Sequence, residues 1–133
     1  MPRNHLVATW FVRLAVGFVF AVNLNCALVF ILKPERYAPG FEISGVSGIV
    51  AVQGFGILFL MWNATYPPVL VRPDRHRTLF AVILAQQAIG LAGETWMWAA
   101  LPAGHAALWA TGLRFIIFDA AGLVGMGLVF LTG

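Results

Sequence analysis

Of the 133 residues in this chain, 61% are hydrophobic and only 10% are charged, whereas soluble domains are about 45–50% apolar and about 25% charged. A domain of this size buries only about two thirds of its surface, so in water this chain would expose large apolar patches, and composition therefore excludes a soluble fold and predicts the lipid bilayer as its surroundings. The formal net charge of +3 comes from basic residues grouped beside apolar runs, a pattern that indicates membrane topology and gives no reason to expect a nucleic-acid partner.

The first apolar run covers residues 6–32 and is interrupted only by Arg13. Residues 14–32 alone give 19 uncharged positions, which is about 28 Å of helix against a hydrocarbon core of about 30 Å. Cys26 is the only cysteine, which excludes an intrachain disulfide and any Cys-x-x-Cys motif. No small-x-small cleavage site follows a short apolar region, so we expect this first helix to stay attached. Residues 33–44, with Pro34 and Pro39, are predicted to form a loop.

Three further spans follow along the chain. The second is predicted over residues 46–66, because Pro67 and Pro68 have no amide hydrogen and are expected to stop the helix. After a basic loop at 71–77, the third span is predicted over 78–101, and after a short turn the fourth over 108–131. The predicted fold is therefore all-α: a polytopic membrane protein that forms an antiparallel bundle of four transmembrane helices, as a single domain over residues 1–133.

Basic residues are more numerous on one side of the predicted spans than on the other. That side carries Arg3, Arg13, Arg72, Arg75 and Arg77, against Lys33 and Arg36 on the opposite side. The positive-inside rule then places both termini in the cytoplasm. The aromatic residues expected near span ends, as interfacial anchors, are Trp10, Tyr37, Trp62, Tyr66, Trp96, Trp98 and Trp109.

Ionisable residues lie inside the third and fourth spans, where each charge costs about 2.5–3.5 kcal/mol on insertion scales. Glu94 and Arg114 are each ten residues from Gly104 in the turn, so on neighbouring helices they should lie at the same depth and form an ion pair. Asp119 is five residues from Arg114, about 140° around the helix, and therefore faces another helix. Arg13 is the long basic residue that could approach Asp119 from the first helix.

Uncharged polar residues at middle depths suggest a polar seam between the helices. Gln87 and Glu94 share one helix face, and Asn23, Asn25 and Gln53 lie at comparable depths in the first two spans. One interpretation is structural: amides and small residues let helices pack closely and hydrogen-bond. The other is functional: intramembrane ionisable groups mark a site for a proton, a quinone or a small ligand. The three histidines lie at span ends or in loops, so neither a haem site nor a metal site is predicted.

Three short segments resemble the DoxX-like family of small four-helix bacterial membrane proteins. They are Arg13-Leu14-Ala15-Val16-Gly17, Lys33-Pro34 and Gln53-Gly54-Phe55-Gly56. The resemblance implies a location in the bacterial inner (plasma) membrane and a link to quinone-coupled sulfur redox or oxidative-stress assemblies. Members of that family tend to carry an acidic residue in the second helix, where this chain has Gln53, so the chemistry of that acid does not carry over.

Three functions are compatible with these features. The chain contains no predicted extramembrane domain, metal motif or nucleophile constellation, so we expect an accessory or structural subunit that contacts other membrane subunits or copies of itself, and not an enzyme. An alternative is a quinone-interacting redox component in which Glu94 and Arg114 grip the head-group and Asp119 relays a proton. A third is a small-solute transporter, which with only four helices would require an oligomer.

Overall fold

A computed structural model describes residues 2–132, and within this range the chain is helical throughout apart from turns. The all-α prediction is confirmed. Four segments are long and apolar enough to cross a membrane. The long helices are α1 (Pro2–Leu32), α3 (Gly45–Asn63), α5 (Arg77–Ala99) and α6 (Ala106–Thr132), and the short ones are α2 (Pro34–Tyr37), the 3-10 helix η1 (Ala38–Phe41) and α4 (Tyr66–Val71).

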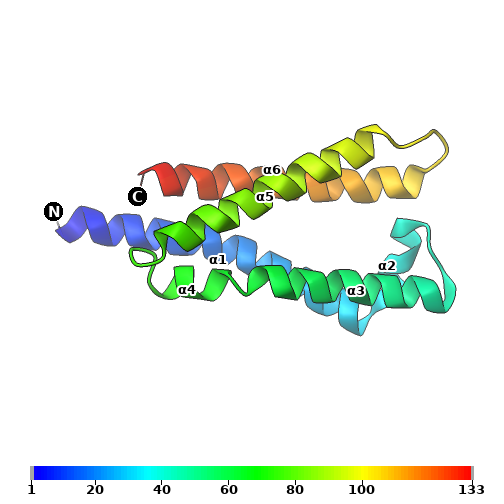
Figure 1. The fold of residues 1–133 in the computed structure, drawn as a ribbon, viewed down its shortest axis with the longest axis horizontal. Helices are drawn as coiled ribbons and strands as arrows, with labels where there is room; N and C mark the ends of the chain where they lie inside the picture. Colours follow the sequence, from blue (N-terminus) through cyan, green and yellow to red (C-terminus); the bar gives the residue numbers. More distant parts are fainter. Residues whose placement is uncertain (1, 133) are drawn as a thin grey trace.

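The chain reverses direction between successive long helices (Figure 1). The start of α1 and the end of α6 lie at the same end of the molecule as the α4–α5 loop, residues 72–76, and we name this the basic end. The α1–α3 connection and the α5–α6 turn lie at the opposite end, which we name the turn end. The helices form two pairs, α1 with α3 and α5 with α6, and α1 joins the pairs by packing on α6. The pairs separate toward the turn end (Figure 1).

The main hydrophobic core lies near the basic end, where both helix pairs contribute to it. Its fully buried members include Val16 of α1, Val69 of α4, Ile83 of α5 and Met126 of α6. A second, smaller cluster lies toward the turn end around Phe30, and its buried residues come only from α1, η1 and α3. The α5–α6 pair is therefore held firmly at one end of the molecule and less closely at the other.

The prediction that Pro67 and Pro68 stop the second span is wrong. Helix α3 already ends at Asn63, and the two prolines lie in the first turn of α4, so the apolar helical segment continues over Gly45–Val71. The first amides of a helix have no intrahelical partner, so proline is tolerated there. Arg13 holds the other end of α4, because its Nε and Nη2 each donate a hydrogen bond of 2.9 Å, to the carbonyl oxygens of Leu70 and Val71.

Residues 33–44, predicted as a loop, are largely folded into α2 and η1. Phe30 of α1 anchors them, with its ring centroid 4.9 Å from that of Tyr37 and 5.9 Å from that of Phe41. Two polar contacts tie this segment to the α5–α6 pair: Thr111 Oγ1 donates to the Gly40 carbonyl at 2.7 Å, and His105 Nδ1 lies 2.7 Å from Glu42 Oε2. The connection therefore bridges the two helix pairs at the turn end.

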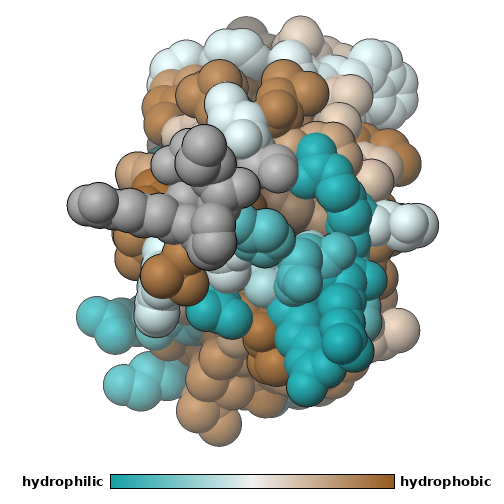
Figure 2. All heavy atoms as spheres, turned by 90° about the vertical axis from the view of Figure 1, so that its left-hand side faces the viewer, coloured by the Kyte–Doolittle hydropathy of each residue, from teal (hydrophilic) through white to brown (hydrophobic). Residues whose placement is uncertain are grey.

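Apolar side chains cover the outer faces of all four long helices. Among the most exposed are Phe18 (67%), Val46 (78%), Ile89 (70%) and Leu131 (80%). Hydrophilic side chains gather at the basic end, as the end-on view in Figure 2 shows; those exposed there include Arg72, Asp74, Arg75 and Arg77. The surface is thus apolar along the sides and charged at this end.

Candidate functional site: a polar cavity between the helix pairs

A cavity of about 760 Å³ lies between the two helix pairs. Its polar lining comes from the four long helices and from α2 and α4: Asn23, Arg36, Tyr37, Asn63, Tyr66, Gln86, Gln87, Glu94, Thr111, Arg114 and Asp119. Its apolar lining is largely aromatic: Phe30, Phe41, Phe59, Trp62, Phe115 and Phe118. The cavity therefore combines carboxyl, amide and guanidinium groups with broad aromatic surfaces.

Five of the eight residues predicted as intramembrane polar candidates line this cavity, and three do not. Those that do are Asn23, Gln87, Glu94, Arg114 and Asp119. Arg13 binds the end of α4 instead, and the side chain of Asn25 is exposed on the outside of α1. Gln53 donates to the Ile31 carbonyl at 3.2 Å and so fastens α3 to α1. The predicted single seam is therefore wrong for Asn25 and Gln53.

Glu94 and Asp119 converge at the polar centre of the cavity. Side chains in a helix tilt toward its N-terminus, which lies at the basic end for α5 and at the turn end for α6. Glu94 of α5 and Asp119 of α6 consequently point toward each other, although Asp119 is the residue nearer the basic end, and both line the cavity. The two helices thus place a carboxyl pair inside the molecule.

The predicted Glu94–Arg114 ion pair is wrong, for the same geometric reason. Arg114 tilts toward the turn end, away from Glu94, and its Nη2 lies 3.4 Å from Thr111 Oγ1. Among the side chains of residues 5–132, the only pair at ion-pair distance is His105–Glu42. The predicted approach of Arg13 to Asp119 is also wrong, because the Arg13 guanidinium is held by backbone carbonyls at the end of α4.

Gln87 fixes the position of Asp119. Its Nε2 donates to the Asp119 carbonyl oxygen at 3.1 Å and lies 3.4 Å from the carboxyl Oδ1. Gly122, one turn further along α6, leaves room for this amide, since a Cβ there would lie 3.0 Å from Gln87 Nε2. By contrast, Glu94 Oε2 is buried and has no hydrogen-bond partner among the described residues. Asp119 is therefore held in place by Gln87, whereas the hydrogen-bonding capacity of Glu94 is not fully used.

A second polar cluster forms the opposite wall. Asn23 Nδ2 donates to Asn63 Oδ1 at 3.0 Å and reaches Tyr66 Oη at 3.5 Å, and Asn63 Nδ2 in turn donates to the Phe59 carbonyl at 2.6 Å. Tyr66, predicted as an interfacial anchor, is only 3% exposed; that prediction is wrong, because its ring stacks on Phe20 in the core. Asn63 and Tyr66 were not predicted as site residues, although an asparagine within an apolar span is a signal that could have identified the first.

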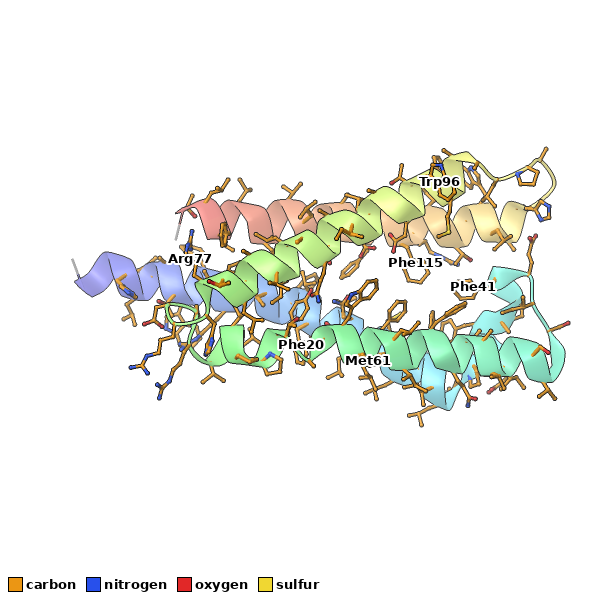
Figure 3. The ribbon with its side chains drawn as sticks, viewed as in Figure 1. Phe20, Phe41, Met61, Arg77, Trp96 and Phe115 are labelled. Carbon is orange, nitrogen blue, oxygen red and sulfur yellow. The ribbon has the colours of Figure 1, made fainter. Side chains whose placement is uncertain are left out.

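Four phenylalanines form an aromatic wall between the carboxyl pair and the turn end. The ring centroids of Phe30, Phe41, Phe59 and Phe115 lie 5.8–6.5 Å apart in the five pairs that approach closely. Phe41 of η1 and Phe115 of α6 point toward each other across the space between the pairs (Figure 3). The folded α1–α3 connection thus supplies one face of the wall.

The cavity is open on one side. The long helices pack in the order α3, α1, α6, α5; in the described part of the chain α3 has no extended contact with α5, and the second span packs on α5 only through α4, near the basic end. Near this gap the two sides are linked by Thr65 Oγ1, which donates to Gln86 Oε1 at 3.4 Å. Trp62 of α3, 45% exposed, lines the cavity at the gap. The side of the cavity between α3 and α5 is therefore the one without extended helix packing.

The chemistry available here is that of binding and proton exchange. Residues 2–132 contain no group of three or more His, Cys, Asp or Glu side chains able to hold a metal ion. What the cavity offers is two adjacent carboxyl groups, amides and a phenol as hydrogen-bonding groups, and aromatic faces. Comparisons of the chain with protein-family models, curated proteins and solved structures found no match.

Proposed function

We propose that this chain is a multi-pass protein of the bacterial inner membrane, inserted as an antiparallel four-helix bundle. The four candidate spans contain 23–28 residues, which is about 35–42 Å of helix and sufficient for a hydrocarbon core of about 30 Å. Their outer faces are apolar, whereas charged side chains gather at the basic end. The exposed arginines there support a cytoplasmic location for both termini.

Within the membrane, the protein binds a small lipid-soluble molecule that carries a polar head. The observation that carries this proposal is the cavity between the helix pairs, which is lined by Glu94, Asp119 and aromatic side chains and lies where α3 and α5 have no extended contact. Ligand sites are typically about 300–1,000 Å³, mostly apolar, and contain a few placed polar groups. A cavity between membrane-spanning helices suits a molecule that is already dissolved in the bilayer.

This proposal gives the carboxyl pair a role that an accessory subunit does not need. Polar groups inside a membrane are costly unless they are paired, and Glu94 Oε2 has no partner among the described residues. A quinone, the ligand class implied by the DoxX-like resemblance, is one molecule of this kind. We do not propose that Glu94 and Arg114 bind the head-group together, because the two side chains point in opposite directions along the bundle.

The test is to fill the cavity and measure what the protein carries. Gly90 lines the cavity, and a Cβ added to it would have no neighbouring atom within 4 Å. The same open space surrounds Gly93, which is exposed and does not line the cavity. Wild-type protein, Gly90→Phe and Gly93→Phe are purified in lipid nanodiscs extracted directly from membranes. Bound small molecules are then extracted and quantified by mass spectrometry.

We expect a lipid-soluble compound at near-equimolar amount in wild type and Gly93→Phe, reduced at least fivefold in Gly90→Phe. Equal retention by the two variants would contradict a ligand in the cavity. A further polypeptide that co-purifies at fixed stoichiometry, with no small molecule bound, would favour the accessory-subunit hypothesis instead.

A further inference from the structure

We propose that the head of the ligand is a monovalent organic cation, and that it binds beside Glu94 and Asp119 in exchange for one proton. This inference rests on the proposed function and adds the charge of the ligand. A quaternary ammonium or phosphonium group that bears apolar substituents is the corresponding chemical class.

The first argument is the imbalance of charge at the centre of the cavity. Two carboxyl groups from the adjacent helices α5 and α6 line the cavity there, and no Arg, Lys or His nitrogen in the described part of the chain lies within 4.0 Å of either. Arg36 and Arg114 line the same cavity, but neither lies within 4.0 Å of the two carboxyl groups, and Arg114 is directed to Thr111. A buried charge without a partner is costly, so the pair requires protons or a bound cation to balance it.

The second argument is the chemistry of the walls. Phe30, Phe41, Phe59 and Phe115 surround the space on the turn-end side of the acids, and Phe59 stacks on Trp62 with ring centroids 6.4 Å apart. Aromatic faces attract cations within about 6 Å of the ring centroid, and most strongly when water is excluded. The same rings provide apolar surface for the substituents of the cation. An acid pair within an aromatic cavity suits an organic cation better than a neutral head-group.

The exchange follows from charge balance. In the empty cavity the two carboxyl groups are neutral when each carries a proton. Entry of one positive charge lets one carboxyl O–H bond break; its proton leaves to bulk water, its electron pair stays on the carboxylate, and the net charge of the site is unchanged. The remaining proton forms the hydrogen bond between the two acids. One proton is therefore released for each monocation bound.

The acids do not face other carboxyl groups that could buffer this exchange. The other titratable or charged side chains that line the cavity are Cys26 of α1, Arg36 and Tyr37 of α2, Tyr66 of α4 and Arg114 of α6. None of them is a carboxylic acid or an imidazole. Proton release on binding should therefore depend on Glu94 and Asp119.

The experiment uses full-length protein in detergent and two probes of similar shape: tetraphenylphosphonium, a cation, and triphenylphosphine oxide, which is neutral. Calorimetric titrations in phosphate and in Tris, which differ in heat of ionisation, report the number of protons released. We expect tetraphenylphosphonium to bind at least tenfold more tightly than the oxide and to release about one proton. Because protons compete with the cation, affinity should rise by up to about tenfold per pH unit.

Glu94→Gln should weaken tetraphenylphosphonium binding at least tenfold and abolish proton release. Glu35→Gln is the matched control, because Glu35 is exposed on α2 and does not line the cavity. If Glu94→Gln does not elute as a folded particle, Asp119→Asn provides the same test. The number of protons released on binding is measured on the wild type and needs no variant.

Two results would overturn the inference. If the oxide binds as tightly as the cation and Glu94→Gln changes neither, the cavity takes a neutral ligand, and the proposed function stands while the cation is ruled out. If neither probe binds, the cation is likewise ruled out, and extraction from Gly90→Phe and Gly93→Phe decides separately whether the cavity holds any ligand.

Discussion

Gly56 shows how one missing side chain determines the packing of two helices. It lies on α3 where α3 meets α1, and a Cβ there would be 2.7 Å from the Ala27 carbonyl oxygen and 2.8 Å from Ile31 Cγ1. The first of these atoms belongs to the backbone of α1, which cannot move aside without shifting the helix. Gly54 lies two residues earlier on α3, and a Cβ added to it would have no neighbouring atom within 4 Å.

We therefore predict that Gly56→Ala separates α1 from α3, whereas Gly54→Ala does not. Overpacking of a close contact costs about 1–3 kcal/mol, and alanine in a helix is otherwise favourable relative to glycine. The free energy of unfolding, measured by titration with sodium dodecyl sulfate in mixed micelles, should fall for Gly56→Ala and stay level or rise slightly for Gly54→Ala. Equal values for the two variants would mean that the contact with Ala27 is not close.

Residue spacing predicted which polar side chains lie inside the bundle better than it predicted their partners. Glu94 and Arg114 were placed at one depth from their distance to Gly104, and both line the cavity. The ion pair was wrong because depth refers to the backbone, whereas side chains on opposed helices tilt in opposite directions. The same tilt brings Glu94 to Asp119, five residues further along α6, a partner that equal spacing from the turn cannot indicate.

At the scale of elements, the α1–α3 connection acts as a cover for the turn end of the cavity. It is held to α6 by the Thr111 Oγ1 hydrogen bond to the Gly40 carbonyl and to the α5–α6 turn by His105 and Glu42. Glu42 follows η1 in a left-handed conformation with φ of 56°, which non-glycine residues rarely adopt. The contacts with α6 and with the α5–α6 turn, and not the backbone preferences of the segment itself, therefore keep it in place.

We predict that Thr111→Val loosens this cover without unfolding the helices. The isosteric change removes a hydrogen bond of about 1 kcal/mol, which corresponds to roughly fivefold faster amide hydrogen exchange in residues 38–44. The control is Thr95→Val, because Thr95 Oγ1 donates only within its own helix, to Leu91. Hydrogen exchange followed by mass spectrometry measures both, and unchanged exchange in Thr111→Val would show that the hydrogen bond does not hold the segment.

Element boundaries in the sequence were easiest to predict where hydropathy changes abruptly and hardest near prolines. The four long apolar segments were recognisable from composition alone. In the sequence, Pro34, Pro67 and Pro68 indicate helix breaks, yet each lies in the first turn of a short helix. A proline in the sequence is compatible with either the end of one helix or the start of the next. Here the packing of Phe30 on Tyr37 and of Tyr66 on Phe20 shows that the prolines begin short helices.

For the whole molecule, the order in which helices pack matters more than their number. The order α3, α1, α6, α5 leaves α3 without extended contact with α5, and the cavity that contains the carboxyl pair lies between the two helix pairs. Nothing in the hydropathy pattern indicates this order, because each helix is apolar around most of its surface. The large core near the basic end joins both helix pairs, whereas the buried residues of the smaller one near the turn end come only from α1, η1 and α3.

The asymmetry between the two ends predicts the orientation of the protein in the membrane. Arg72, Arg75 and Arg77 are exposed at the basic end, and the positive-inside rule assigns that end to the cytoplasm. In a Cys26→Ser background, Asp74→Cys and Ala103→Cys place one thiol in an exposed position at each end. A membrane-impermeant maleimide added to intact spheroplasts should label the Ala103→Cys protein, and should label the Asp74→Cys protein only after lysis. The reverse pattern would invert the orientation and place the His105–Glu42 bridge on the cytoplasmic side, while labelling of both thiols before lysis would contradict a membrane-spanning arrangement.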